Sequence, residues 1–452
     1  MVLDGLNPKL VFEYFEQICA IPHGSGNEER ISKFIAEFAA SRGLKYVRDS
    51  YNNVVIYADG TAGYEDHATV ILQGHMDMVA EKEEGCPIDM TTEGLRLMID
   101  GDWITADGTT LGGDDGIAVA FMLAILDDAS IAHPPLECVF TTDEEVGMSG
   151  AAGLDMSVIK GRTMINLDSE DEGYLLVSCA GGIRVNSAFP VVRENFETRA
   201  SYKVEITGLP GGHSGCDIHL NKPNADVELG KKLASLMEAD PSLRICEIRG
   251  GTKDNVIPSS AYAIVVCDTE VGQAVGEVDS AFDNESTQRV IRALTELPNG
   301  VQRMSKDIED LPELSLSLGV VDTVGDEVIM KRLIRSNVEQ SKKDLANELA
   351  ASTLILGGSV TFGGDYPGWE YRANSPLRDL MVEVFSEQYG REPVVQAIHA
   401  GVECGMFDIG LNGLDAVSIG PDMQDIHSPR ERLSISSTTR VWNYVLEVLK
   451  RL

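Results

Sequence analysis

The sequence predicts an α/β protein in which a domain with helices on both faces of a mixed sheet is interrupted by an inserted α+β domain. Helix-like and strand-like segments alternate over about the first 180 residues. From about Ala188 the pattern changes to half-exposed strands and amphipathic helices, and the first pattern returns after about residue 368. The predicted parts are residues 1–187 and 369–452, which form one domain, and residues 188–368, which form the insertion. The length of 452 residues is more than a single ordinary core needs.

The first part contains both amphipathic and fully buried segments. Apolar residues recur at helical spacing over 10–21 and 29–43, and the second segment ends at Gly43. Residues 117–129 are apolar on nearly every side, which predicts a largely buried helix. Strands are predicted at 52–58, 68–74, 136–142 and 163–168.

The middle part contains two successive α+β units of about 90 residues each. The first has a strand at 200–208, a helix at 224–239 and strands at 244–251 and 260–268. The second has helices at 286–297 and 340–352 around strands at 314–325 and 327–337. The last part then adds a helix at 376–390, strands at 393–398 and 414–420, and a final helix from about Ser437.

Composition excludes several classes of partner. Asp and Glu total 72 against 37 Lys and Arg, a formal charge of −35, which disfavours nucleic acids and anionic membranes as partners. No apolar run approaches the roughly 18 residues of a membrane span, and no secretory signal is visible. The eight cysteines are scattered singly, which is typical of reduced thiols in a cytoplasmic protein.

Acidic residues and histidines recur where predicted strands end, the usual position of ligand-binding groups in an α/β sheet. Each has an ordinary explanation by itself, such as a helix N-cap for Asp115 or an exposed acidic turn after residue 142. Together they offer the mixture of imidazole and carboxylate that zinc prefers. The candidates are His75 and Asp77 in "GHMD", Asp114 in "GGDDG", Glu144 and Glu145 in "TTDEEVG", Asp168 in "INLDSED", and His427 in "DIHSPRERL".

Two divalent cations account for this set. The predicted ligands are His75, Asp114, Glu145, Asp168 and His427. If one aspartate bridges, three carboxylates and a hydroxide neutralise two dications, so the cluster can be buried without a large charge penalty. Because adjacent residues of an extended chain point in opposite directions, Glu144 is free to act as general base while Glu145 binds metal. Asp77 can accept the N–H of His75 and orient the ring.

Six motifs in this order resemble the aminoacyl-histidine (Xaa-His) dipeptidases, a branch of the co-catalytic zinc family that also contains carboxypeptidases and deacylases. They are "GHMDMV", "GGDDGIAVA", "TTDEEVGMSGA", "LDSED", "GLPGGHSGCDIH" and "DIHSPRERL". The resemblance implies a zinc-peptidase catalytic domain with an inserted lid domain, with Asp114 bridging the metals and a cis peptide after it. It also implies the same roles for Glu144 and Asp77. The sequence "DDGI" replaces the Asp-Lys-Gly of many other relatives, which favours the dipeptidase branch.

The resemblance also implies substrate-binding residues in the lid domain. His213 in "GGHSG" would stabilise the developing oxyanion. Asn255 in "KDNVIP" and Arg335 in "LIRSN" would bind the substrate carboxylate, and Gly401 in "IHAGVECG" would bring its backbone close to the substrate. No chemical role is assigned to four neighbours in these motifs: His219, His399, Cys216 and Cys404.

These residues predict a cytoplasmic enzyme that hydrolyses unblocked dipeptides, including Xaa-His and β-Ala-His, by a hydroxide bound to two metal ions. The expected ions are Zn²⁺, with Mn²⁺ or Co²⁺ as alternatives, and the resemblance implies a homodimer. The alternatives are an N-acyl-amino-acid deacylase or carboxypeptidase of the same family, a catalytically silent relative, and a non-catalytic acidic metal-binding protein.

Overall fold

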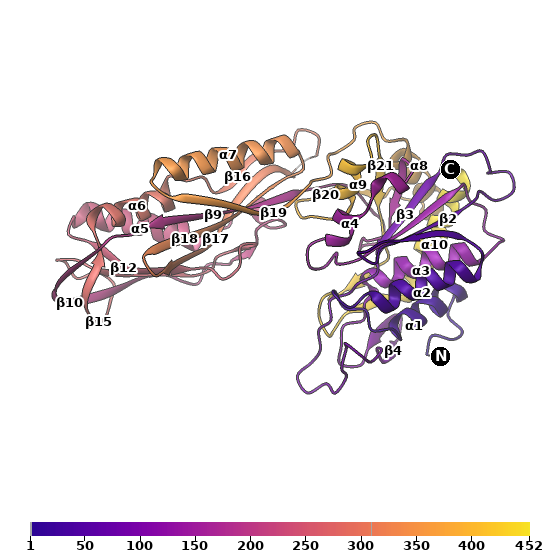
Figure 1. Ribbon diagram of the computed structural model, residues 1–452, viewed down its shortest axis with the longest axis horizontal. Coiled ribbons are helices and arrows are strands. Elements are labelled where there is room, and N and C mark those ends of the chain that lie inside the picture. The colour runs from indigo at the N-terminus through magenta and orange to yellow at the C-terminus, as the bar shows by residue number, and fades with distance from the viewer. Residues whose placement is uncertain (1, 309) are drawn as a thin grey trace. The chain divides into compact units, whose positions relative to one another are not determined.

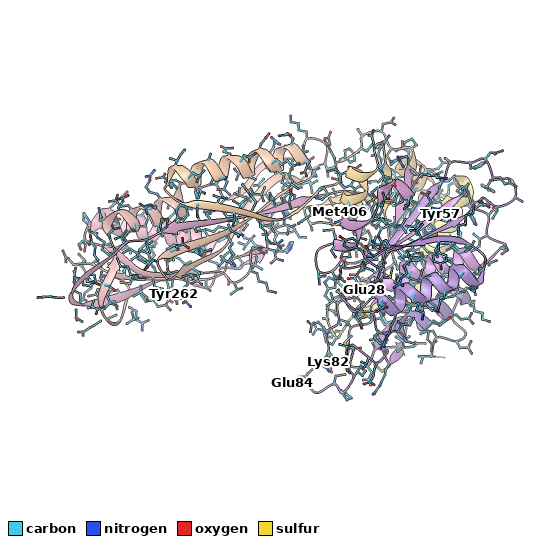
Figure 2. The ribbon with its side chains drawn as sticks, in the orientation of Figure 1. Glu28, Tyr57, Lys82, Glu84, Tyr262 and Met406 are labelled. Carbon is cyan, nitrogen blue, oxygen red and sulfur yellow. The ribbon has the colours of Figure 1, made fainter. Side chains whose placement is uncertain are left out.

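The protein is described here by a computed structural model that covers residues 2–308 and 310–452 and divides into two compact units (Figure 1). Unit 1 runs to Val177 and includes Arg372–Gln396 and Met406–Leu452. Unit 2 consists of Ser178–Tyr371 and Ala397–Gly405. Glu28 and Tyr57 lie in unit 1, and Tyr262 lies in unit 2 (Figure 2).

Unit 1 is built on an eight-stranded sheet in the order β1-β2-β6-β3-β7-β21-β8-β20. Strand β3 is parallel to β6 and β7, and β21 is parallel to β7, whereas β1 and β2 pair antiparallel with their neighbours. Every residue of β3 and β6 is buried, as expected for central strands covered on both faces. The strands are β1 (Lys45–Arg48), β2 (Val54–Ala58), β3 (Val70–His75), β6 (Leu136–Thr141), β7 (Thr163–Asn166), β8 (Tyr174–Cys179), β20 (Val394–Ile398) and β21 (Asp415–Ser418).

Helices pack on this sheet, and a second, four-stranded sheet lies beside them. Helix α3 contacts β3 and α1, and its central turns are buried on all sides, as the apolar run at 117–129 predicts. The helices are α1 (Lys9–Cys19), α2 (Glu29–Ser41), α3 (Gly113–Asp127), α4 (Ser149–Gly153), η1 (Met156–Val158), α8 (Pro376–Tyr389), α9 (Cys404–Gly410) and α10 (Ile435–Arg451). The small sheet has the order β22-β23-β5-β4, with β4 (Leu97–Asp100), β5 (Trp103–Ala106), β22 (Met423–Gln424) and β23 (Arg432–Ser434). The predicted mixed α/β fold is confirmed.

Unit 2 is built on a nine-stranded sheet in the order β15-β10-β14-β12-β17-β18-β9-β19, with β16 paired to β17. The two predicted α+β units therefore share one continuous sheet and one hydrophobic core. The strands are β9 (Gly181–Pro190), β10 (Arg193–Ile206), β12 (Arg244–Gly250), β14 (Ala261–Val266), β15 (Gln273–Phe282), β16 (Gly300–Met304), β17 (Pro312–Val324), β18 (Glu327–Ser336) and β19 (Ser359–Tyr366). Its remaining elements are β11 (Gly212–His213), β13 (Val256–Ile257), η2 (Ile218–Leu220), α5 (Ala225–Ala239), α6 (Asn284–Thr295) and α7 (Glu339–Ile355).

The structure divides the chain at other positions than those expected from sequence. Strand β9 spans the expected boundary at 187/188, and all of it lies in unit 2, where it pairs with β18 and β19. The segment Ala397–Gly405 also joins unit 2, which no change of sequence pattern indicates. Among the helices of the described residues, none is both long and apolar enough to cross a lipid bilayer.

Candidate functional site

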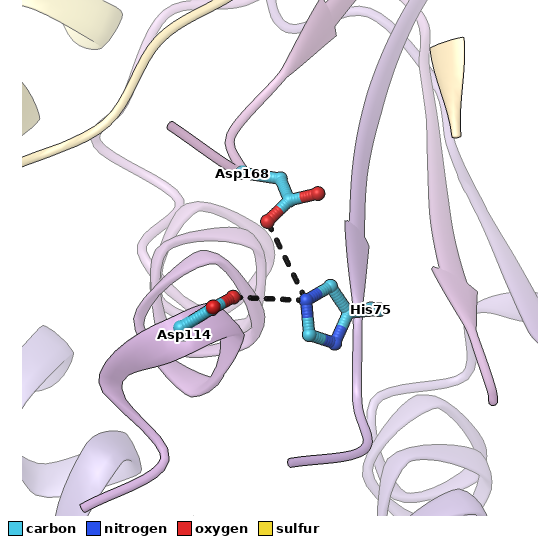
Figure 3. Close-up of side chains that lie close together, drawn as sticks. All are labelled: His75, Asp114 and Asp168. Atoms are coloured by element: carbon cyan, nitrogen blue, oxygen red, sulfur yellow. Dashed lines mark hydrogen bonds and ion pairs between the residues drawn. The ribbon is translucent and has the colours of Figure 1, made fainter. Parts of the chain in front are cut away.

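Three side chains from separate segments of unit 1 meet at one edge of its sheet (Figure 3). His75 is the last residue of β3, Asp168 follows β7, and Asp114 lies at the start of α3, where the backbone departs from helical angles. The Nε2 atom of His75 lies 3.0 Å from Asp114 Oδ1 and 3.4 Å from Asp168 Oδ1. His75 is only 1% exposed, so these contacts lie in a buried environment.

A second group shares Asp114 with the first. The Nε2 atom of His427 lies 3.1 Å from Asp114 Oδ2 and 3.0 Å from Glu145 Oε2. Glu145 lies in the loop after β6, and His427 lies in the turn between β22 and β23 with a φ of 58°. In each of the two groups, the candidate ligand atoms lie within 4.8 Å of one another.

The arrangement around Asp114 fits two neighbouring divalent cations. One oxygen of Asp114 faces His75 and the other faces His427, so a single carboxylate lies between two sets of ligands. The Oε1 atom of Glu145 is buried and has no hydrogen-bond partner, which leaves a lone pair for a cation. Imidazole nitrogens and carboxylate oxygens in this proportion suit Zn²⁺ and similar ions. The Asp114–Asp115 peptide bond is cis, as the resemblance implies.

Without metal ions, protons on the side chains of this cluster supply the positive charge that balances its carboxylates. Hydrogen bonds to Asp114 and Glu145 raise the pKa of His427 to about 10. Burial lowers the pKa of His75, but Asp168 and Asp114 outweigh it and raise that pKa well above its usual value. Burial raises the pKa of Asp168 to about 6 despite the opposing effect of His75. The cluster therefore attracts positive charge strongly.

Asp77 connects His75 to the loop that carries the two glutamates. Its Oδ1 accepts from the Glu144 backbone N–H at 3.1 Å, and its Oδ2 accepts from Ser25 Oγ at 2.8 Å. The Nδ1 atom of His75 lies 3.0 Å from the Asp77 backbone oxygen and 3.4 Å from Asp77 Oδ1. Because both neighbours are acceptors, Nδ1 keeps its proton and Nε2 is the nitrogen that faces the candidate cation site. Ser25 was not predicted from the sequence, although it lies in the glycine-flanked turn "HGSGN".

His213 in unit 2 has its tautomer set by backbone groups. Its Nδ1 accepts from the N–H groups of Gly215 at 3.2 Å and Cys216 at 3.0 Å, so the ring proton of neutral His213 is on Nε2. Burial and the charge of Arg335 lower the pKa of His213, which keeps the ring neutral. His213 is therefore a hydrogen-bond donor through Nε2.

The other predicted substrate-binding residues of unit 2 surround the same loop. The Asn255 carbonyl accepts from the Ser214 N–H at 2.9 Å. Arg335 is 5% exposed, donates to the Tyr366 hydroxyl at 2.9 Å, and has a buried Nε without a hydrogen-bond partner. Tyr366 was not found from sequence because it lies on β19, far from Arg335 along the chain.

Gly215 lies where the side chains of His213 and Arg335 and the backbone of His399 converge. A Cβ atom there would lie 2.3 Å from the His399 carbonyl oxygen, 3.0 Å from His213 Cε1 and 3.1 Å from Arg335 Nε. His399 itself is buried and its Nε2 lies 2.7 Å from Ser315 Oγ, so it packs behind the loop. Gly401 follows closely on His399, and the Ala400 carbonyl accepts from the Ala180 N–H at 3.0 Å.

Comparison with known proteins identifies the family. Residues 71–451 match the model of peptidase family M20/M25/M40. The chain is 36% identical to a cytosol non-specific dipeptidase of Escherichia coli K12, over 100% of this chain and 99% of that protein. The chain belongs to peptidase family M20/M25/M40. Family membership and the two ligand groups around Asp114 together make it a metallopeptidase.

Two solved structures of peptidases share the fold of this chain. An aminoacylhistidine dipeptidase from Vibrio alginolyticus matches with a TM-score of 0.94 and 34% identity, covering 100% of this chain and 98% of that one. The aminopeptidase PepT from Bacillus cereus matches with a TM-score of 0.60 and 17% identity, covering 98% of both chains. The second match shows the shared fold alone.

Proposed function

We propose that this M20 peptidase hydrolyses the single peptide bond of unblocked dipeptides, including Xaa-His and β-Ala-His. The observation that carries the proposal is the position of Asp114, whose two oxygens face two different histidines in a cluster with Asp168 and Glu145. The names of the E. coli and Vibrio relatives support a dipeptide substrate over an acylated amino acid.

In this proposal two Zn²⁺ ions would be held by His75, Asp114, Glu145, Asp168 and His427, and Asp114 would offer one oxygen to each ligand group. When bound, such ions lower the pKa of a water molecule and polarise the scissile carbonyl. Glu144 takes the proton from the attacking water and delivers it to the leaving amine. Asp77 keeps His75 in the tautomer that leaves Nε2 free.

Residues of unit 2 recognise the substrate in this proposal. His213 donates a hydrogen bond from Nε2 to the developing oxyanion. Arg335 and Asn255 bind the free carboxylate of the dipeptide, because a guanidinium group matches a carboxylate with two parallel hydrogen bonds. The Gly401 backbone lies along the substrate. Capture of the carboxylate one residue beyond the cleaved bond limits the substrate to two residues.

A substrate panel with and without metal tests this proposal. The protein is stripped with a chelator, reloaded with Zn²⁺, Mn²⁺ or Co²⁺, and assayed on β-Ala-His, ordinary dipeptides, tripeptides and N-acetylated amino acids. We expect two ions per chain, loss of activity on stripping, and cleavage of the unblocked dipeptides alone. Preference for N-acetylated substrates would indicate a deacylase. Full activity after complete metal removal, or binding of calcium without hydrolysis, would rule the proposal out.

We also propose that the protein acts in the cytoplasm, as the name of the E. coli relative and the eight free cysteines support. The homodimer stays a prediction. Light scattering after gel filtration measures the mass of the assembly directly.

A further inference from the structure

A buried carboxylate that no step above uses lies beside the bridging aspartate. Glu431 is 3% exposed, and its Oε2 accepts from the backbone N–H groups of Leu111 at 2.8 Å and Gly112 at 3.1 Å. Its Oε1 accepts from the N–H groups of Gly113 at 2.8 Å and Asp114 at 3.4 Å. One carboxylate thus satisfies four consecutive backbone donors.

Gly113 and Asp114 are the first two residues of α3, where backbone N–H groups have no partner within the helix, and Leu111 and Gly112 directly precede it. The partial positive charge on these N–H groups favours a negative charge at this position. Two glycines make the approach possible: Gly112 has a φ of 67°, and a Cβ on Gly113 would lie 3.3 Å from Glu431 Oε1. Gly112 thus supplies a left-handed turn, and Gly113 leaves room for the Glu431 carboxylate.

The carboxylate also connects two loops that each carry a candidate metal ligand. Glu431 is four residues after His427 in the motif "HSPRE", in a turn held by the Glu431 N–H to Ser428 carbonyl bond of 3.0 Å. The Ser428 hydroxyl in turn donates to the Asp425 carbonyl at 2.7 Å. His427 thus lies in a short, internally bonded turn whose far end is attached to the backbone of Asp114.

We infer that Glu431 is a positioning residue that holds the Asp114 loop against the His427 turn and so forms the cation subsite of Asp114, Glu145 and His427. The inference rests on the proposed function, because it takes these three residues as metal ligands. His75 and Asp168 are supported by β3 and β7, so the subsite that they share with Asp114 depends less on Glu431.

The substitution Glu431→Gln tests this role because it keeps the shape of the side chain. The amide has one acceptor oxygen, and its NH₂ group would face two backbone donors instead of accepting from them. We expect one cation to bind 10- to 100-fold more weakly and the other to bind nearly as before. The visible absorption spectrum of the Co²⁺-loaded protein should change, because the geometry of one ion is altered.

Glu137 provides a matched control in the same unit. It is 2% exposed and accepts from the backbone N–H groups of Lys160 at 3.0 Å and Gly161 at 2.9 Å. It lies near the start of β6, about 20 Å of extended chain before the glutamate loop. Glu137→Gln should lower the melting temperature as Glu431→Gln does, but leave both cation affinities and the Co²⁺ spectrum unchanged.

A further variant separates loss of the carboxylate from loss of the fold. In Glu431→Ala the four N–H groups are left without a partner, and millimolar formate should restore the weakened cation site and part of the activity. Wild-type protein with the same formate is the control. If Glu431→Gln does not fold, Glu431→Asp, which keeps the charge on a shorter side chain, is measured by the same criteria.

Two results would overturn the inference: unchanged affinity for both cations in Glu431→Gln, or an equal loss in Glu137→Gln. Failure of the wild-type protein to bind two cations would instead count against the proposed function. Zn²⁺ and Co²⁺ titrations against a chelating dye measure all of these affinities.

Discussion

Two histidines show how neighbouring groups give one residue type opposite properties. The Nδ1 atom of His75 faces acceptor oxygens of Asp77 and keeps its proton, so Nε2 is the nitrogen that binds a cation once its own proton is displaced. The Nδ1 atom of His213 instead accepts from two backbone N–H groups, so its proton lies on Nε2. His75 is thereby suited to bind a cation and His213 to donate a hydrogen bond.

The proposed base offers the most direct prediction for a single residue. Glu144→Gln removes the proton acceptor but belongs to neither candidate ligand group. We expect kcat to fall about 10²- to 10⁴-fold while two cations still bind. Steady-state kinetics and metal analysis of the same sample measure both quantities. Glu145→Gln is the control, because it should lose metal as well as activity; wild-type kcat in Glu144→Gln would contradict the role.

Among the structural elements, the turn after β11 organises much of the candidate substrate site in unit 2. It holds the ring of His213 through two N–H groups, and its position is maintained by the Ser214 N–H to Asn255 carbonyl bond. Gly215 must be a glycine because the His399 carbonyl leaves no space for a side chain. A small change in this turn should therefore alter the use of substrate without altering the binding of the metal ions.

Gly215→Ala tests the role of this turn. The added methyl group would lie 2.3 Å from a backbone oxygen, so the turn must shift and His213 with it. We expect kcat/KM to fall at least about tenfold, equivalent to about 1.4 kcal/mol, while both cations bind as in the wild type. Gly363→Ala is the control, since a Cβ there meets nothing within 4 Å. Loss of metal in Gly215→Ala, or equal losses of activity in both variants, would contradict this view.

At the scale of the whole molecule, folding concentrates negative charge that the sequence spreads over the chain. The formal charge is −35, and three of the carboxylates meet in one cluster with two histidines. In the metal-free protein the raised pKa of His427, about 10, means that its ion pairs stabilise the fold fully below about pH 6.5 and are lost as the pH rises through 10. Cations must displace the same protons to bind.

Metal affinity should therefore rise with pH. His75 and His427 are both protonated at pH 7 in the metal-free protein, so loading both sites releases up to two protons. We expect each displaced proton to change the apparent affinity about tenfold per pH unit between pH 6 and 8.5. The raised pKa of Asp168, about 6, adds a third proton in more acidic solution. Chelator competition at a series of pH values measures the slope, and an affinity independent of pH would contradict the prediction.

Local patterns in the sequence were sufficient to predict the mixed α/β fold and most of its central elements. Continuous apolar runs mark the buried strand at 68–74 and the buried helix at 117–129, and parallel neighbours end at the same edge of a sheet. That is why residues as distant as His75 and Asp168 could be placed together before any coordinates were known. The resemblance added the motifs of unit 2, which no periodicity reveals.

Contacts between distant segments could be known only from the folded chain. The pairing of β9 with β19, the division at Val177/Ser178, the Tyr366 partner of Arg335 and the attachment of Glu431 to the Asp114 loop all join segments without a shared local pattern. A hydrogen bond between such segments depends on the packing of everything between them. Periodicity records only which way each residue faces within its own element, so tertiary structure alone decides which groups meet.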